Sequence, residues 1–297
     1  MADANRPLLL AGNDGTPIPN RRIAWRITYL KVAALTVVLT IWNLVSRRKV
    51  TSAQSDVDVS LTTYGRRATS AFATIESIGL GSLRPRRLIL WIDEPELVAH
   101  PPATLRRLVK RGLEIIPCEA NGPHSKYFPY CQRFSDDRKL LATADDDMLY
   151  PRWWLRALVE AYTREPGHVV AHRAWAVLQD ENGYSPYAKW ALCSSSEARF
   201  DLFATGVSGV LYDHKMVELL RRAGTGFRSA CPRADDVWLH FVALASGVKV
   251  RQVRRQASEF WPRLRTSING LARENTTGGG NDIALASTAR LFRQNAE

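Results

Sequence analysis

Three adjacent aspartates, Asp145, Asp146 and Asp147, follow the apolar run Leu140–Ala144 and are the residues of this sequence most suited to chemistry. Adjacent carboxylates repel one another, so such a cluster in a partly buried place requires a cation. Asp145 and Asp147 point to the same side of an extended chain and can both bind one metal ion. Oxygen ligands suit Mg²⁺ or Mn²⁺, whose remaining coordination positions are commonly filled by water and substrate phosphates. The alternative is an acidic turn that caps the next helix.

The segments around these aspartates alternate between strand and helix patterns. Apolar, β-rich runs predict strands at residues 56–64, 86–93, 113–118 and 139–147, and a β-hairpin around the turn DENG. Helical periodicity predicts helices at residues 68–79, 102–112, 151–162 and 235–246. This alternation predicts an α/β fold with a mostly parallel central sheet and flanking helices. Ligands of such sheets bind at the carboxyl ends of the strands, which is where the three aspartates fall.

An apolar segment near the N-terminus differs sharply in composition from the rest of the chain. Ile27–Val45 is almost wholly apolar and has basic residues on both sides. Nineteen residues at a rise of about 1.5 Å just reach across a hydrocarbon core of roughly 30 Å. We therefore expect a disordered tail over residues 1–24, a single membrane-spanning helix over 25–47 and a globular domain over 50–297. The alternative is an amphipathic helix buried in the globular domain.

The charge of the chain favours anionic partners. It has 41 Lys and Arg residues against 29 Asp and Glu, a net charge of +12. The stretch Lys249–Arg265 is basic and includes Phe260 and Trp261, a composition typical of a surface that meets anionic lipid headgroups. The alternative for this stretch is a solvated sheet edge whose aromatic residues belong to the core. No spacing typical of a nucleic-acid-binding motif accompanies the charge, so nucleic acid is not an expected partner.

Seven sequence blocks, taken together and in order, carry a resemblance to a known family. They are SLTTYGRR, IESIGLGSLRPRRLILWIDE, HSKYFPY, ATADDDMLYPRWW, GVSGVLY, CPRADDVWL and GGGNDI. In this order they resemble a family of bacterial glycosyltransferases with the A-type, Rossmann-like nucleotide-sugar fold, which is associated with surface polysaccharide and glycolipid assembly. The resemblance covers roughly residues 56–290.

The resemblance implies a binding site for a nucleoside diphosphate-sugar. Asp145 and Asp147 match the Asp-x-Asp metal motif, with Asp146 nearer the ribose. A bound Mn²⁺ or Mg²⁺ would stabilise the negative charge of the departing diphosphate. The other nucleotide-sugar residues implied are Thr62, Tyr64, Arg66, Asp93 and Lys126. The alternatives are a solvated basic surface for Arg66 and a sheet-edge surface for Lys126.

The resemblance also implies a catalytic base and an acceptor side. Asp236, with Asp235 beside it, matches the acidic pair from which one carboxylate takes the proton of the attacking hydroxyl in inverting enzymes of this fold. The alternative is a helix cap, because the helix dipole stabilises a negative charge at its N-terminus. Either Trp153 or Trp154 is expected to stack on a sugar ring, and the alternative for both is the core.

The function expected from these features is metal-dependent, inverting transfer of a sugar to a glycan or lipid-linked acceptor. Because nucleotide sugars are made in the cytosol, we expect a membrane-associated protein whose catalytic domain faces the cytoplasm. The main alternative is a non-catalytic basic adaptor that binds membranes or anionic glycans. A phosphohydrolase would normally collect His or further carboxylate ligands for a second metal, and the sequence presents no such set.

Overall fold

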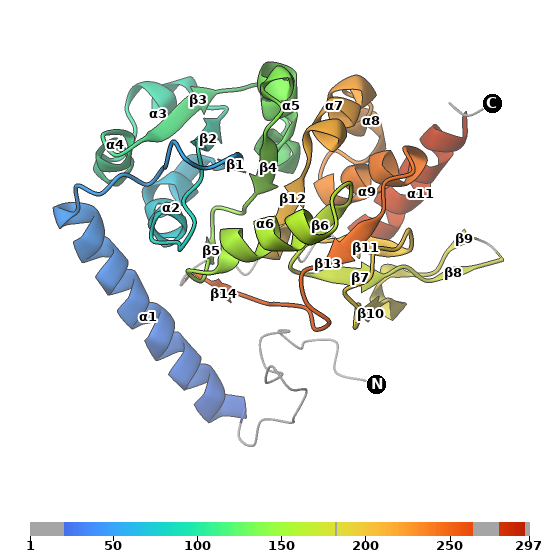
Figure 1. The fold of residues 1–297 in the computed structure, drawn as a ribbon, viewed down its shortest axis with the longest axis horizontal. Coiled ribbons are helices and arrows are strands. Elements are labelled where there is room, and N and C mark those ends of the chain that lie inside the picture. The colour runs from blue at the N-terminus through green and yellow to red at the C-terminus, as the bar shows by residue number, and fades with distance from the viewer. Residues whose placement is uncertain (1–20, 182, 264–278, 295–297) are drawn as a thin grey trace.

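A mostly parallel sheet forms the centre of the molecule (Figure 1). The computed structural model describes residues 21–181, 183–263 and 279–294. The seven strands lie in the order β13–β6–β12–β4–β1–β2–β3. Their bounds are β1 Val57–Thr62, β2 Leu88–Ile92, β3 Leu113–Pro117, β4 Leu140–Thr143, β6 Val169–Ala171, β12 Val210–Tyr212 and β13 Val250–Gln252. Strand β12 is antiparallel to β4 and β6, and the other pairs are parallel, which confirms the predicted fold class.

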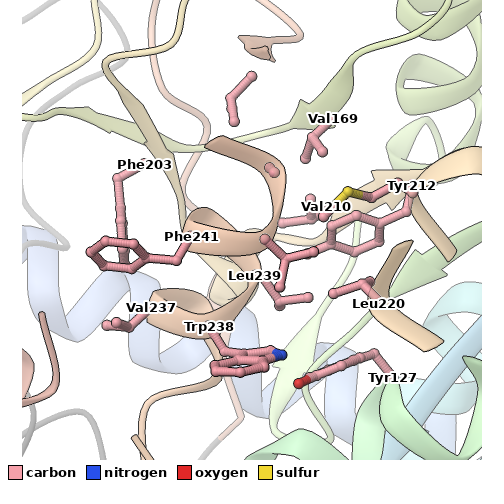
Figure 2. Close-up of a cluster of buried hydrophobic side chains, with 14 of the residues drawn as sticks. Tyr127, Val169, Phe203, Val210, Tyr212, Leu220, Val237, Trp238, Leu239 and Phe241 are labelled. Carbon is pink, nitrogen blue, oxygen red and sulfur yellow. The ribbon is translucent and has the colours of Figure 1, made fainter. Parts of the chain in front are cut away.

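Helices cover both faces of this sheet, and alternating side chains divide the core in two. In β2, Ile89 and Trp91 belong to one core, whereas Leu88 and Leu90 belong to the other, as expected when successive side chains point to opposite faces. The helices that contribute to the first core are α5 Phe128–Phe134, α7 His214–Ala223, α8 Phe227–Ala230, α9 Asp235–Ala245 and α11 Gly280–Gln294. Figure 2 shows this core, with Leu239 of α9 near β12.

The second core lies on the other face of the sheet and is formed mainly by helices from the first half of the chain. It includes residues of α1 Arg21–Val45, α2 Phe72–Gly79, α4 Ala103–Val109 and α6 Trp154–Arg164. The short helix α3 Pro95–Ala99 lies beside β2 and β3. The 3₁₀ helices are η1 Gly65–Thr69, η2 Gly122–Lys126, η3 Ser135–Asp137, η4 Tyr187–Lys189 and η5 Gly206–Ser208. Helix α6 begins three residues later than the sequence predicts, because Pro151 to Trp153 form a turn before it.

Three small sheets complete the fold. They are β7 Ala174–Ala176 with β10 Ala191–Leu192 and β11 Leu202–Ala204, β5 Met148–Leu149 with β14 Trp261–Pro262, and β8 Gln179–Asp180 with β9 Gly183–Tyr184. The predicted hairpin around DENG is present as β8 and β9, but it is shorter than expected. The strands before it, which were expected to belong to the hairpin, pair elsewhere: β6 belongs to the central sheet and β7 to the three-stranded sheet.

Helix α1 begins at Arg21, so residues 21–24 are helical and not part of the expected tail. Residues 1–20 of that tail lie outside the described residues. The part Arg26–Val45 has a mean hydropathy of 1.6 and is long and apolar enough to cross a membrane. One face of α1 is nevertheless packed against the domain, because Val32 and Leu39 are buried in the second core.

The basic stretch predicted to meet lipid headgroups is only partly on the surface of the domain. Arg251 and Arg263 are buried, and so is Phe260. Nη1 of Arg251 lies 2.6 Å from Oε2 of Glu165. The guanidinium of Arg254 lies 4.4 Å from the centre of the Trp153 ring. Arg251, Phe260 and Arg263 are therefore not part of an exposed surface, whereas Arg254, Arg255 and Trp261 are exposed. For the exposed residues the membrane surface stays a prediction, and Arg265 lies outside the described residues.

Candidate active site

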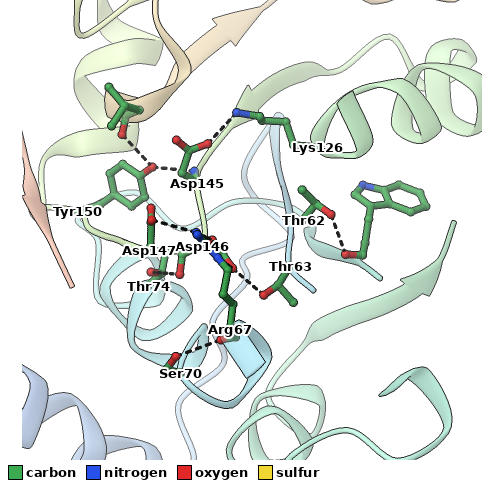
Figure 3. A network of polar contacts seen from close by, with 12 residues as sticks. Thr62, Thr63, Arg67, Ser70, Thr74, Lys126, Asp145, Asp146, Asp147 and Tyr150 are labelled. Carbon is green, nitrogen blue, oxygen red and sulfur yellow. Dashed lines mark hydrogen bonds and ion pairs between the residues drawn. The ribbon is translucent and has the colours of Figure 1, made fainter. Parts of the chain in front are cut away.

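The three aspartates lie between β4 and β5, beside the carboxyl-terminal end of β1 (Figure 3). Hydrogen bonds from neighbouring elements fix their backbone. The amide of Asp145 donates to the hydroxyl of Tyr150 at 2.9 Å, and Oγ1 of Thr74 in α2 donates to the carbonyl of Asp146 at 2.8 Å. The motif predicted from the sequence is thus held on a short, well-supported connection at the ligand-binding edge of the sheet.

Arg67 neutralises two of the three carboxylates. Its Nε lies 3.1 Å from both carboxylate oxygens of Asp146, and its Nη2 lies 2.9 Å from Oδ2 of Asp147. Oγ1 of Thr63 donates a further bond of 2.6 Å to Asp146, which is buried. The pKa of Asp147 is nevertheless raised, first by burial and then by the charge of Asp145. The cluster therefore carries more negative charge than Arg67 offsets.

The sequence prediction named Arg66 as a partner of a donor phosphate, and in the structure it is its neighbour Arg67 that faces the aspartates. Both residues lie in η1, where successive side chains point about 120° apart, so only one of them can face the aspartates. Gly65 begins this turn with a φ of 51°, a left-handed conformation that glycine adopts without strain. Arg66 is exposed, and its role towards a donor phosphate stays a prediction.

Lys126 connects the three aspartates to the acidic pair of α9. Its Nζ lies 2.7 Å from Oδ1 of Asp145 and 3.0 Å from Oδ2 of Asp235, and the side chain is 8% exposed. Oγ of Ser60 in β1 donates to the carbonyl of Lys126 at 2.6 Å and fixes the end of η2. Burial would lower the pKa of Lys126, but the attraction of the surrounding carboxylates raises it well above its usual value. The ammonium group therefore remains charged, and the sheet-edge alternative is excluded.

Asp236 has the properties of a proton acceptor. Burial, followed by the charge of Asp235, raises the pKa of Asp236 to about 8. The amide of Gly206 in η5 donates to its Oδ1 at 3.0 Å. The residue before α9 is Ala234, which provides no side-chain cap, and the amide of Gly206 that bonds to Asp236 lies outside α9. A carboxyl group with a raised pKa in such a cluster is typical of a general base. Asp236 also lies in the first turn of α9, where the helix dipole acts on its charge.

The remaining residues predicted to bind the nucleotide-sugar lie at the same edge of the sheet, but they differ in how far their side chains are exposed to a ligand. Oγ1 of Thr62 donates to the carbonyl of Trp91 at 3.1 Å, which ties it into the sheet. Tyr64 is 52% exposed, and the guanidinium of Arg67 lies 5.5 Å from its ring centre. Asp93 follows β2 and is partly buried. Tyr64 and Asp93 are therefore open to a ligand at this edge.

The two tryptophans have different environments. Trp154 is 1% exposed, and its Nε1 donates to the carbonyl of Ser208 at 2.9 Å, so it belongs to the core and not to a sugar-binding surface. Trp153 is partly buried, packs 5.6 Å from the ring of Phe260 and lies beneath the guanidinium of Arg254. Of the two candidates, Trp153 is the one that keeps an exposed surface.

The charges of the cluster fit a divalent cation. Five carboxylates lie near three basic side chains, which leaves two uncompensated negative charges when all are ionised; these residues are Asp145, Asp146, Asp147, Asp235, Asp236, Arg67, Lys126 and Arg263. Among the described residues, no three His, Cys, Asp or Glu side chains are arranged to hold a metal unaided. The site therefore suits an ion such as Mg²⁺ or Mn²⁺, bound through one or two carboxylates and completed by a ligand's phosphates.

Sequence reasoning missed Arg67 and Arg263. The doublet Arg66–Arg67 was a usable signal for the first, because only the turn geometry decides between its members. Arg263 reaches the site through the pairing of β14 with β5, and its amide donates to the carbonyl of Asp147 at 2.7 Å. No local pattern in the sequence reveals that pairing.

Comparison with known proteins supports the fold assignment. No family model and no curated protein sequence matches the chain. Among solved structures, the mannosyltransferase PcManGT from Pyrobaculum calidifontis, in complex with GDP-Man and Mn²⁺, aligns over 87% of this chain and 76% of its own, with 14% identity and a TM-score of 0.51.

Two further structures give weaker matches. GalNAc-T7 with UDP, GalNAc and Mn²⁺ aligns over 72% of this chain and 44% of its own, at 12% identity and a TM-score of 0.48. TarS 1–349 from S. aureus aligns over 69% and 59%, at 11% identity and a TM-score of 0.47. The likeness to the mannosyltransferase shows that this chain has the A-type glycosyltransferase fold.

Proposed function

We propose that the chain is a glycosyltransferase that moves a sugar from a nucleoside diphosphate-sugar to a hydroxyl of a glycan or lipid-linked acceptor. The observation that carries the proposal is the cluster around Lys126, which brings Asp145 and Asp235 to one ammonium group. A metal-type acidic motif and a carboxyl group of raised pKa, Asp236, thereby lie in one site at the carboxyl end of the sheet. Sugar transfer needs both, because a diphosphate must leave while a hydroxyl loses its proton.

The donor lies, in this proposal, at the edge formed by β1, β2 and β4. The exposed ring of Tyr64 packs on the base, and Asp93 accepts hydrogen bonds from the base or ribose. Asp146 lies towards the ribose, and Lys126 faces the diphosphate. The catalytic domain comprises residues 50–297.

A divalent cation completes the donor site. Asp145 and Asp147 would hold Mn²⁺ or Mg²⁺, together with the two phosphates of the donor. The ion supplies positive charge beside the departing diphosphate. The raised pKa of Asp147 is due first to burial and then to the charge of Asp145, and a cation bound between the two carboxylates would offset that repulsion.

Asp236 removes the proton from the acceptor hydroxyl. The hydroxyl oxygen then bonds to the anomeric carbon as the bond from that carbon to the diphosphate oxygen breaks, which inverts the configuration. The proton ends on the Asp236 carboxyl, whose pKa of about 8 suits a base working near neutral pH. Asp235 supports the site through its ion pair with Lys126. Trp153 contributes an aromatic surface for the acceptor or the transferred sugar.

The cellular setting follows from α1 and from the donor. The apolar helix associates the protein with a membrane, and the site faces the cytoplasm, where nucleotide sugars are made. The acceptor is then a glycan or glycolipid of the cell surface that is assembled at the inner leaflet.

A donor panel tests the proposal. The full chain in detergent is incubated with Mn²⁺ and several nucleoside diphosphate-sugars, and release of the nucleoside diphosphate is measured. We expect slow hydrolysis of one donor, which an acceptor accelerates and Asp236→Asn abolishes. Binding without turnover for every donor and acceptor would instead favour the basic adaptor. A product that retains the anomeric configuration would contradict the single displacement.

A further inference from the structure

The exposed side of α1 is unlike that of a helix on a water-soluble surface. Leu30, Val37, Ile41 and Leu44 recur at the spacing of one helix face and are 66, 58, 54 and 58% exposed. No polar side chain interrupts this face between Leu30 and Leu44. The hydroxyl of Thr40, on the flank, donates to the carbonyl of Thr36 within the helix. An uncovered apolar strip of this length requires an apolar partner.

The opposite side of α1 is fixed to the domain by apolar packing and by a buried polar network. Val32 and Leu39 are 2 and 1% exposed and belong to the core that also contains α2 and β5. Asn43 is 1% exposed, and its Nδ2 donates to Oε1 of Glu76 in α2 at 2.8 Å. Nε of Arg107 in α4 donates to Oδ1 of Asn43 at 2.9 Å. The amide of Asn43 is thus satisfied on both sides, which gives α1 one defined position on the domain.

This packing conflicts with a helix that crosses the bilayer. The buried positions run from Val32 to Asn43, a rise of about 17 Å, and the described part of the helix before them, Arg21–Lys31, is about 16 Å long. A hydrocarbon core is roughly 30 Å thick, so a crossing would draw the core of the domain into lipid. Figure 1 shows the C-terminal end of α1 beside α2 and α4.

We infer that α1 lies along the membrane surface, with its exposed apolar face immersed in an anionic leaflet and its other face on the domain. Charge at both ends of the strip supports this orientation. Arg26 and Lys31 are exposed at one end, and Arg47, Arg48 and Lys49 are exposed at the other. A helix in the plane of the interface presents all five to one layer of headgroups. The inference concerns membrane attachment and does not rest on glycosyl transfer.

Topology in sealed vesicles tests the inference. The full chain, tagged at both termini, is bound to phosphatidylcholine vesicles containing about 30% phosphatidylglycerol, or inserted into them during synthesis. Protease added outside should remove both tags after either route, because an in-plane helix leaves both ends on one side. Protection of one tag, released only when the vesicles are opened, would show a spanning helix and overturn the inference.

A matched pair of substitutions tests which face meets the lipid. Ile41 lies on the apolar strip, and Thr40 is an exposed neighbour on the flank. Ile41→Gln should weaken vesicle partition about tenfold, whereas Thr40→Gln should change it by less than about twofold, since only Ile41 transfers an apolar side chain into lipid. Both chains should melt at the temperature of the parent. Equal losses, or no loss in either variant, would overturn the inference, as would a lipid-free dimer that Ile41→Gln dissociates.

Discussion

Replacing Asp236 with Asn separates its contribution to stability from its contribution to turnover. Asparagine has nearly the same shape and keeps an Oδ1 to accept the hydrogen bond from the amide of Gly206. It removes only the ability to ionise. In the native protein, burial and the charge of Asp235 raise the pKa of Asp236 from 3.8 to about 8, so ionising this group acts against folding.

The sign and size of the effect follow from the two pKa values. Between about pH 4 and pH 8 the folded chain keeps the proton and the unfolded chain does not, so the free energy of unfolding falls as pH rises. One group shifted in this way contributes about 1.4 kcal/mol per pH unit. Asp236→Asn should therefore have a larger free energy of unfolding than the parent. The difference should grow from near zero at pH 4 to at most about 4 kcal/mol at pH 7. The partial exposure of the side chain makes this an upper bound.

Urea unfolding from pH 5 to pH 8, combined with turnover assays, checks the reasoning. Turnover of Asp236→Asn should fall by roughly 10²–10⁴-fold although the chain is more stable. The kcat/KM of the parent should rise with pH up to about 8, as the base ionises. Asp235→Asn is the control, and it should destabilise the chain because Lys126 loses a partner at 3.0 Å. An Asp236→Asn chain that is less stable at every pH, yet retains turnover, would refute the assignment.

Three further predictions concern the cations of the site. Asp147→Asn, or EDTA added to the parent, should lower the release of nucleoside diphosphate by at least about 10³-fold, while the circular dichroism spectrum stays unchanged. Full turnover in EDTA would exclude a metal. Arg67→Gln should lower the free energy of unfolding by about 2–3 kcal/mol because Asp146 and Asp147 lose their shared cation, whereas the exposed Arg66→Gln should stay within about 0.5 kcal/mol. Lys126→Gln should cost about 3–5 kcal/mol in urea unfolding, and an unchanged midpoint would show that the bridge between Asp145 and Asp235 contributes nothing.

The fold was predictable because its signals are local. Each central strand on the N-terminal side is a short apolar run followed by a helical pattern, and parallel pairing follows from that alternation. The location of the three aspartates was predictable for the same reason, since a polar cluster that ends a buried strand lies at the edge of the sheet. The reversed strand β12 and the pairing of β14 with β5 depend on contacts between distant segments, and the sequence pattern did not reveal them.

The pairing of charges within the site was not predictable. Lys126 lies far in sequence from Asp235, and their contact depends on how η2 and α9 pack. Choosing Arg67 over Arg66 requires the geometry of a 3₁₀ turn. The same limit explains Trp154, because it begins α6 while Trp153 lies in the turn before it, and the sequence cannot show which of the two side chains faces the core.

The burial of Asn43 between α2 and α4 determines where this chain can be shortened. Cutting before Thr51, an obvious way to remove an apolar N-terminus, would uncover the pocket of Leu39 and leave Glu76 and Arg107 without their amide partner. Each buried apolar side chain that is removed costs about 1.5–3 kcal/mol, and an uncovered second core would promote aggregation. A soluble version is better obtained by substituting the exposed apolar residues of the helix than by deleting it. Polar residues would replace Leu30, Val37, Ile41 and Leu44, and the buried Val32, Leu39, Asn43 and Val50 would be kept.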